Sequence, residues 1–237
     1  MKKLLLSTFV VIFSMLFLLS CDDAHNTTTS YYDGLFTVWG ESVIPELQDT
    51  AFVVGDMSGI GLETGDKALM RVSCLIDNVF GPKYAEWQVD KVYEEIDVNA
   101  LAALSSSDST LYTSPILGIG GYYTYGAAWA WRGCQMLNVV YNSKGIAAPQ
   151  FVMSVDGVEK DTLRLSLSAR IEDGNETRSK LLCYDLATAK QFINEKSLVE
   201  IGSYDSIYTT VSMLYQDIEN DTILTGTIIG GKLVNPF

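Results

Sequence analysis

Two groups of acidic residues come nearest to a chemically active pattern in this 237-residue chain. Glu94 and Glu95 are neighbours in a strand-like run, so their side chains point to opposite faces, whereas glycoside hydrolysis needs two convergent carboxyls. Asp217, Glu219 and Asp221 have the alternating spacing of a calcium loop, but the glycine and the twelfth-position acid of such a loop are missing. We therefore predict no metal site and no cofactor.

Histidine and cysteine chemistry is equally limited. The single histidine, His25, lies in a polar stretch near the N-terminus, so a Ser/His/Asp triad, a Cys/His dyad or a multi-histidine metal site cannot form within one chain. Cys74, Cys134 and Cys183 form no Cys-x-x-Cys pair, and no histidine in the folded region can activate them. We predict buried, inert thiols and a protein that is not an enzyme.

The N-terminus has the pattern of a lipoprotein leader. Lys2 and Lys3 precede an apolar run from Leu4 to Leu19, and the sequence Leu-Leu-Ser-Cys ends at Cys21. A basic start and a short apolar core are typical of a signal peptide over residues 1–20. The alternative, a membrane-spanning anchor, is disfavoured because the run is short and a polar stretch follows it. We expect acylation (palmitate) of Cys21, and attachment to the membrane through that lipid.

Residues 21–30 are mostly small and polar, and they are predicted to be the lipid-bearing tether. The pair Asp22-Asp23 resembles the surface-export signal of Bacteroides-type lipoproteins, whereas in enteric bacteria Asp at this position resembles a signal for retention at the inner membrane. The sequence predicts a cell-envelope lipoprotein, placed at the outer membrane and exposed on the surface if the first rule applies.

Composition favours a folded protein and disfavours nucleic acid as a partner. Hydrophobic residues make up 48% of the chain and aromatic residues 11%, which is enough to build a core. The formal net charge of −13 repels polyphosphate chains. The partners that remain are the membrane, a protein or a glycan.

Alternation of apolar and polar residues predicts an all-β fold. Leu163 to Ile171 and Ala68 to Ile76 alternate with a period of two, as half-buried antiparallel strands do. Similar runs predict strands at 35–39, 51–54, 87–96, 136–142, 151–155, 181–184, 207–215 and 222–229. Little helix is expected beyond a short amphipathic segment at 186–195. The polar stretch 105–110 is the predicted linker between a first domain, 31–104, and an antiparallel β-sandwich, 111–237.

Several short motifs carry a family resemblance. They are Cys21-Asp22-Asp23, Tyr32-Asp33-Gly34, the run from Gly65 to Met70, the run from Trp131 to Tyr141, and Tyr184-Asp185-Leu186. Together they resemble the NigD-like lipoproteins of Bacteroides-type bacteria. The resemblance implies a small OB-type β-barrel followed by a β-sandwich, and it implies no reaction.

An aromatic stretch is the best candidate for ligand binding. It consists of Tyr122, Tyr123, Tyr125, Trp129 and Trp131, whose flat rings can stack on sugar faces. The alternative is that Trp129 and Trp131, which share one strand face, line the core of the sandwich. OB-type barrels bind oligosaccharides or oligonucleotides, and the acidic balance disfavours the latter.

Five triplets of Asp, then Ser or Thr, then an apolar residue or Thr resemble the O-glycosylation signal of Bacteroides-type exported proteins. Their hydroxyl residues are Thr50, Ser109, Thr162, Ser206 and Thr222. The alternative is a turn Asp that leads into a β-branched strand start.

These observations favour a non-catalytic cell-envelope lipoprotein, anchored at Cys21, whose two β-domains bind a protein or glycan partner. A carboxylate-based glycan-active enzyme is the first alternative, motivated by 29 acidic residues and many aromatic ones. A structural or immunity-type subunit of an envelope complex is the second.

Replacement of Cys21 tests the leader directly. Cys21→Ala removes the sulfur that forms the thioether, and no other cysteine follows a leader-like run. Metabolic labelling with a fatty-acid probe should therefore fall to background in the variant. Unchanged labelling would show that the lipoprotein interpretation is wrong.

Overall fold

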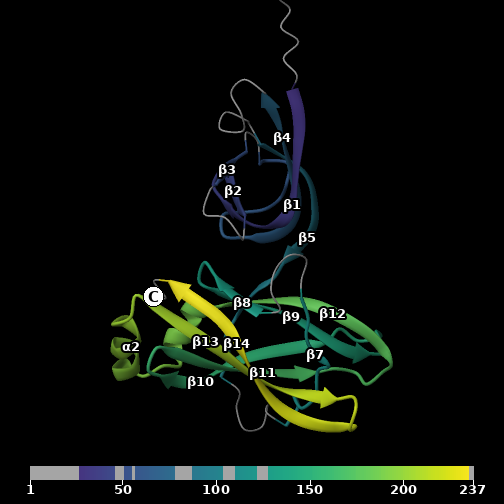
Figure 1. Cartoon of the computed structure of the whole chain (residues 1–237), viewed down its shortest axis with the longest axis vertical. Coiled ribbons are helices and arrows are strands. Elements are labelled where there is room, and N and C mark those ends of the chain that lie inside the picture. The colour runs from purple at the N-terminus through teal and green to yellow at the C-terminus, as the bar shows by residue number, and fades with distance from the viewer. Residues whose placement is uncertain are drawn as a thin grey trace, which may run out of the picture.

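The computed structural model describes residues 27–45, 51–54, 57–77, 87–103, 110–121 and 128–234. Almost all of the elements are strands, which confirms the all-β prediction, and they form two bodies, one above the other in Figure 1. The helical elements are a 3₁₀ helix, η2 (Leu186–Gln191), and α2 (Glu195–Gly202), close to the expected helical segment. No helix among the described residues is long and apolar enough to cross a membrane. The predicted signal peptide and Cys21 lie outside the described residues.

The first body is a five-stranded antiparallel sheet with the order β3-β2-β1-β4-β5. Its strands are β1 (Thr27–Trp39), β2 (Ser42–Pro45), β3 (Phe52–Val53), β4 (Lys67–Asp77) and β5 (Trp87–Ile96). The sheet curls until its edges meet at one bridge between Val54 and Trp87, where the rings of Phe52 and Trp87 stack 4.1 Å apart. The expected OB-type barrel is thus a curled sheet that does not close into a continuous barrel.

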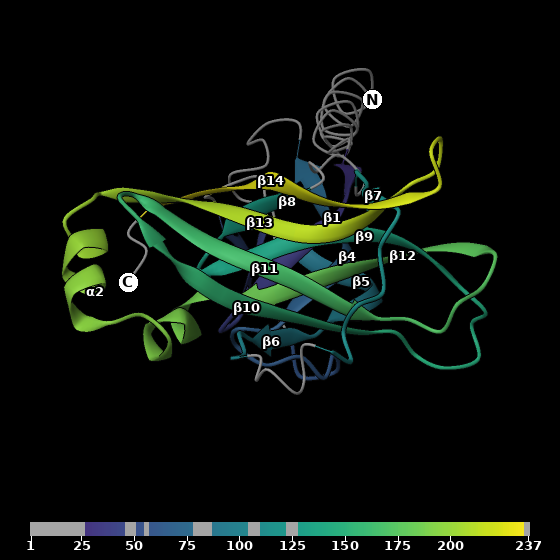
Figure 2. The ribbon, with the colours of Figure 1, turned by 90° about the horizontal axis from the view of Figure 1, so that it is seen from below.

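The second body is a β-sandwich (Figure 2). One sheet has the order β10-β11-β13-β14, from β10 (Gln150–Glu159), β11 (Thr162–Arg170), β13 (Ser206–Asp217) and β14 (Thr222–Val234). The other has the order β6-β12-β9-β7, from β6 (Val98–Ala100), β12 (Glu176–Asp185), β9 (Cys134–Ser143) and β7 (Gly118–Ile119), and β8 (Ala128–Trp131) also pairs with β9. Leu163, Leu165 and Leu167 face the core between the sheets, as their alternation predicted.

The sandwich is mixed, which corrects the expectation of a purely antiparallel one. β11 pairs with β13 in parallel, and β6 pairs with β12 in parallel. The first pairing arises because the chain leaves β11, passes through β12 in the other sheet, and returns through η2 and α2 before it starts β13. Parallel neighbours need such a long crossover, and strand periodicity does not reveal it.

The elements begin and end at positions that local polarity did not reveal. β1 starts at Thr27, so the last residues of the expected tether pair with residues 74–77 of β4. β6 pairs with β12, and Leu101 lies in the sandwich core, so the chain enters the sandwich at about Asp97, before the polar stretch 105–110. Residues 104–109 are outside the described part.

A small buried cluster joins the two bodies. It consists of Leu35 from β1, Ile96 from β5, Cys134 and Met136 from β9, and Leu181 and Cys183 from β12, and we call it the junction cluster. Trp129 of β8 packs against it. The ammonium of Lys67 is buried close by and donates a hydrogen bond to Oγ1 of Thr37, 2.9 Å away. The first body and the sandwich are therefore packed against each other through buried side chains.

One buried amide holds four strands of the sandwich together. Nε2 of Gln135, in β9, donates to the carbonyl oxygens of Trp129 in β8 and Gly230 in β14, at 3.0 and 2.9 Å. Its Oε1 accepts a hydrogen bond from the hydroxyl of Thr209 in β13. Gly230 has no side chain, and a Cβ there would lie 2.6 Å from Oε1 of Gln135. The amide thus joins the edges of both sheets at one point.

Loss of this amide should be costly. Gln135→Leu keeps the volume but leaves a buried hydroxyl and two carbonyl groups without their partner, so we expect a loss of about 3 kcal/mol in the free energy of unfolding. Urea denaturation measures it. The matched change Gln88→Leu, at an exposed position of β5, should cost less than about 0.5 kcal/mol. Equal losses in both variants would contradict the role of Gln135.

Candidate functional site

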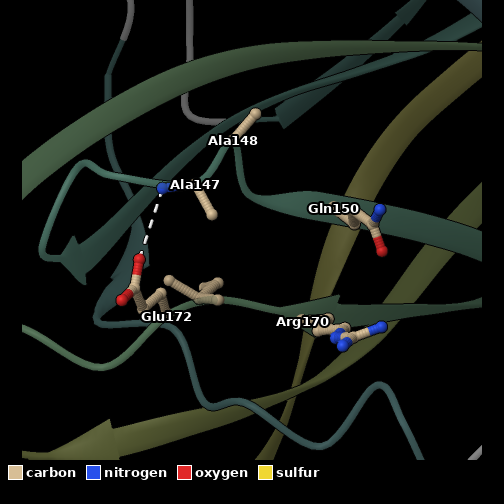
Figure 3. Close-up of a pocket in the computed structure, with 6 residues that line it drawn as sticks. Ala147, Ala148, Gln150, Arg170 and Glu172 are labelled. Carbon is tan, nitrogen blue, oxygen red and sulfur yellow. Dashed lines mark hydrogen bonds between the residues drawn. The ribbon is translucent and has the colours of Figure 1, made fainter.

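The loop end of the sandwich carries an open cavity of about 440 Å³ (Figure 3). Its lining residues are Ala147, Ala148, Gln150, Arg170, Ile171 and Glu172, and we call it the end cleft. Gln150 begins β10 and Arg170 ends β11, and the two are direct cross-strand neighbours. Glu172 follows on the loop after β11. The ends of two paired strands and the loops next to them therefore position every polar group of the cleft.

The polar groups of the end cleft differ in whether they already form hydrogen bonds within the protein. One carboxylate oxygen of Glu172 accepts the backbone N–H of Ala147 at 3.3 Å, which fixes the loop across the cleft (Figure 3). The guanidinium of Arg170 and the amide of Gln150 are exposed on the opposite side. Arg170 brings up to five N–H donors and Gln150 brings a donor and an acceptor, over the apolar floor of Ile171. Such a set can donate hydrogen bonds to carboxylate or carbonyl groups, and it can exchange them with hydroxyl groups.

Two further cavities lie along the sandwich. A cavity of about 490 Å³ is bounded by β7, β8, β13 and β14, with Ile119, Ala128, Met213 and Ile228 among its lining residues. A smaller one of about 150 Å³ lies beside the end cleft and shares Ile171 with it. Among the described lining residues, Glu172 is the one carboxylate of the end cleft and Asp173 that of the smallest cavity. The described residues of these three cavities therefore do not include the two facing acids that glycoside hydrolysis uses.

The acidic groups singled out in the sequence lie elsewhere. Glu94 and Glu95 are exposed on β5, where they pair with Leu69 and Ala68 of β4. Asp217 closes the β13–β14 turn, because its carboxylate accepts the backbone N–H of Glu219 and the side-chain amide of Asn220, at 3.1 and 2.8 Å. These hydrogen bonds lower the pKa of Asp217. Among the described residues, no group of three or more His, Cys, Asp or Glu side chains is placed to hold a metal ion.

The structure buries Cys74, Cys134 and Cys183, and it brings two of them together. Cys134 and Cys183 lie on the same face of β9 and β12, and Cys183 is opposite Met136. A hydrogen bond from Cys183, aided by the nearby charge of Lys67, lowers the pKa of Cys134. Burial raises the pKa of Cys74. The prediction of buried thiols is confirmed, but the pairing of Cys134 with Cys183 was not foreseen.

The aromatic stretch is only partly within the described residues. Tyr122, Tyr123 and Tyr125 lie outside them, and so does the side chain of Trp131. Trp129 is half-buried and packs against the junction cluster, so it contacts the seam between the two bodies and not the main core of the sandwich. Its role in ligand binding stays a prediction.

The predicted glycosylation residues occupy strand starts where they are described. Thr162 begins β11, Ser206 begins β13 and Thr222 begins β14. The hydroxyl of Thr162 donates to the carboxylate of Asp161 at 3.2 Å, as a turn Asp next to a strand start does. Thr50 and Ser109 lie outside the described residues.

The end cleft was missed by sequence reasoning. The alternation of β11 placed Arg170 and Glu172 on the polar side of the strand, where any solvated face has such residues. Their convergence with Gln150 depends on the register of β10 with β11 and on the loop at 144–149. Arg170, at the end of a strand rich in Ser and Leu, was a possible signal in the sequence. Without the strand register, however, it does not identify a site.

Comparison with known proteins places the chain by fold and not by sequence. No protein-family model matches the chain, and no curated protein matches it. Similar solved structures include one described provisionally as toxin-related from Parabacteroides distasonis, with a TM-score of 0.59, 13% identity, and coverage of 87% of this chain and 94% of that one.

Two further structures bear on the expected family. A NigD-like immunity protein from Bacteroides caccae has a TM-score of 0.54 and 12% identity over 83% of this chain and 91% of that one. A protein described provisionally as a lipoprotein from Bacteroides fragilis has a TM-score of 0.58 and 14% identity over 84% of this chain and 97% of that one. The chain therefore has the two-body fold of NigD-like and related Bacteroidales proteins, which confirms the resemblance at the level of fold.

Trp129 provides a test of the seam between the bodies. Trp129→Ala removes a half-buried ring from the junction cluster, so we expect a loss of about 2 kcal/mol, less than the ~3–5 kcal/mol of a fully buried tryptophan. Thermal unfolding measures it. Trp39→Ala, at a side chain that is 64% exposed, is the control and should stay within about 0.5 kcal/mol of the parent. A Trp129 variant as stable as the Trp39 variant would contradict the packing role.

Proposed function

We propose that this protein is a non-catalytic lipoprotein of the cell envelope that binds a protein or glycan partner through the loop end of its sandwich. The lipid on Cys21 would hold it at the outer membrane, and the first body would separate the end cleft from that membrane. The observation that carries the proposal is a fold shared over more than four fifths of the chain with a NigD-like immunity protein and with a protein described provisionally as a lipoprotein.

The chemistry of the cavities supports binding over catalysis. The described residues of the end cleft include a single carboxylate, and one of its oxygens already accepts a hydrogen bond from the N–H of Ala147. A hydrolase that uses two acids needs both of them free, on either side of the bond to be broken. Arginine next to an exposed amide is instead typical of the centre of a recognition surface, where Arg is enriched.

The position of the end cleft also supports this role. Strand β1 starts at the end of the first body that points away from the sandwich (Figure 1). Anchoring ahead of β1 would leave the loops of the sandwich accessible to large partners. The immunity-type subunit, our second candidate, is the same binding activity with a toxic protein as the partner, and the name of the Bacteroides caccae protein favours it.

Crosslinking in living cells tests the end cleft. A photo-crosslinking residue at the position of Ala148 should form one discrete adduct, and Arg170→Glu should reduce that adduct at least tenfold because it reverses the charge of the main donor. Arg164→Glu is the matched control, since Arg164 lies on the same strand and is also exposed. Protease digestion of the adduct identifies a protein partner, and periodate sensitivity identifies a glycan.

Two results would contradict the proposal. Absence of an adduct, or an equal loss in the Arg170 and Arg164 variants, would remove the end cleft as the binding surface. Saturable glycan hydrolysis by the purified protein, abolished by Glu172→Gln, would show a catalytic protein instead.

A further inference from the structure

The last described strand, β14, has an outer edge on which no other described strand is paired. β14 lies at the end of the sheet order β10-β11-β13-β14, and among the described strands β13 alone pairs with it. β8 packs beside its C-terminal part, where a Cβ on Gly231 would lie 2.4 Å from the backbone of Ala130. The segment Ile223–Ile229 precedes that contact, and we call it the free edge. Figure 2 shows β14 along the upper margin of its sheet.

The free edge itself, Ile223–Ile229, lacks the features that discourage strand pairing, and the bulge of β14 lies just beyond it, at Gly230. Ile223 is 58% exposed and Ile229 is 75% exposed. Residues 222–231 include no charged side chain and no proline. Proteins usually protect such an edge with lysine, proline or a bulge, because its N–H and C=O groups are a template for a further strand.

The sequence of the free edge is symmetric in residue class about Gly226. Thr225 and Thr227 flank the glycine, Leu224 and Ile228 follow, and Ile223 and Ile229 end the segment. An antiparallel pair related by a twofold axis through Gly226 places each residue opposite its counterpart of the same class. The most exposed residues, Ile223 and Ile229, would then face each other across the two chains, on the same side of the sheet.

The ends of the strand complement each other in charge under the same symmetry. The turn that precedes β14 carries Asp217, Glu219 and Asp221, and Lys232 lies near the other end of the strand. Rotation about Gly226 carries the acidic turn of one chain toward the end of β14 that holds Lys232 of the partner subunit. Other registers lose this match, because a shift of two residues sets isoleucine opposite threonine or the acidic residue 221.

Gly226 is packed closely at the axis. The ring of Tyr215, on β13, covers it, and a Cβ there would lie 2.9 Å from Cε1 of that ring. The glycine therefore lets the aromatic ring pack directly against the strand. The cavity of about 490 Å³ reaches the same segment through Gly226, Thr227, Ile228 and Ile229, so a second strand would cover its rim.

We propose that two copies of this chain associate through their free edges, in an antiparallel pairing centred on Gly226, so that their two four-stranded sheets form one continuous eight-stranded sheet. The occupant of the edge is a second copy because the edge is self-complementary in side-chain class and in charge. This association is independent of the partner at the end cleft.

A charge placed on the free edge tests the surface. The full chain, purified in non-ionic detergent, should sediment at equilibrium as a dimer, and Ile229→Lys should weaken the dimer at least tenfold, because a lysine on the edge would meet Ile223 of the partner subunit. Val199→Lys is the matched control, since Val199 is also 75% exposed but lies on α2. A monomeric parent chain, or equal effects of the two changes, would overturn the proposal.

A disulfide tests the register. Thr225 of one chain is opposite Thr227 of the other, so the double variant with Thr225→Cys and Thr227→Cys should form covalent dimers on mild oxidation. Thr225→Cys alone should not, because its counterpart remains threonine. Covalent dimers from the single variant, or none from the double variant, would overturn the pairing centred on Gly226.

Discussion

Burial of two strands on both of their faces is the constraint on which the rest of this structure depends. Leu35 and Phe36 are adjacent in β1 and both are fully buried, the first in the junction cluster and the second in the core of its own sheet. β9 repeats this arrangement, since Cys134 and Met136 face the junction while Leu137 and Val139 face the sandwich core. Neither strand can change register without moving a polar or bulky side chain into one of two cores. The relative position of the bodies is thereby determined by packing.

A charge is placed inside this packed region. Lys67 begins β4, pairs with Thr37 of β1 and Ile96 of β5, and keeps its ammonium buried. A buried cation is costly unless polar groups surround it, and the hydroxyl of Thr37 supplies one of them. Its field also acts on Cys134 across the seam and favours the thiolate form of that residue. The interaction couples the first body to the second by electrostatics as well as by apolar contact.

The short-range features of the fold follow from the sequence. Alternation in Leu163 to Ile171 requires one apolar face, and β11 presents that face to the core. The long-range features do not follow in the same way. The parallel pairing of β11 with β13 brings together strands that have another strand and two helical elements between them. The three residues of β6 are too few to show any period.

The candidate site was harder to predict for the same reason. Gln150 and Arg170 are twenty positions apart, and only the register of one hairpin makes them neighbours. Cys134 and Cys183 meet because β9 and β12 pair with Met136 opposite Cys183. Residue types were enough to exclude a catalytic triad and a multi-histidine site. The end cleft and the cysteine contact depend instead on strand pairings, which composition does not reveal.

The separation of the two bodies along the chain has a consequence for biogenesis. The strands of the first body follow one another in sequence and end at Ile96, so their sheet can form while the remaining chain is still being synthesised. The sandwich cannot form in this way, because the partner strands of β6 and β11 are β12 and β13, which come later in the chain. Closing these long loops is slow, and during that interval the apolar side chains of β1 and β5 that face the junction have no cover. Misassociation is therefore most favoured after the first body has formed and before the sandwich has formed. Rapid completion of β12 shortens this interval.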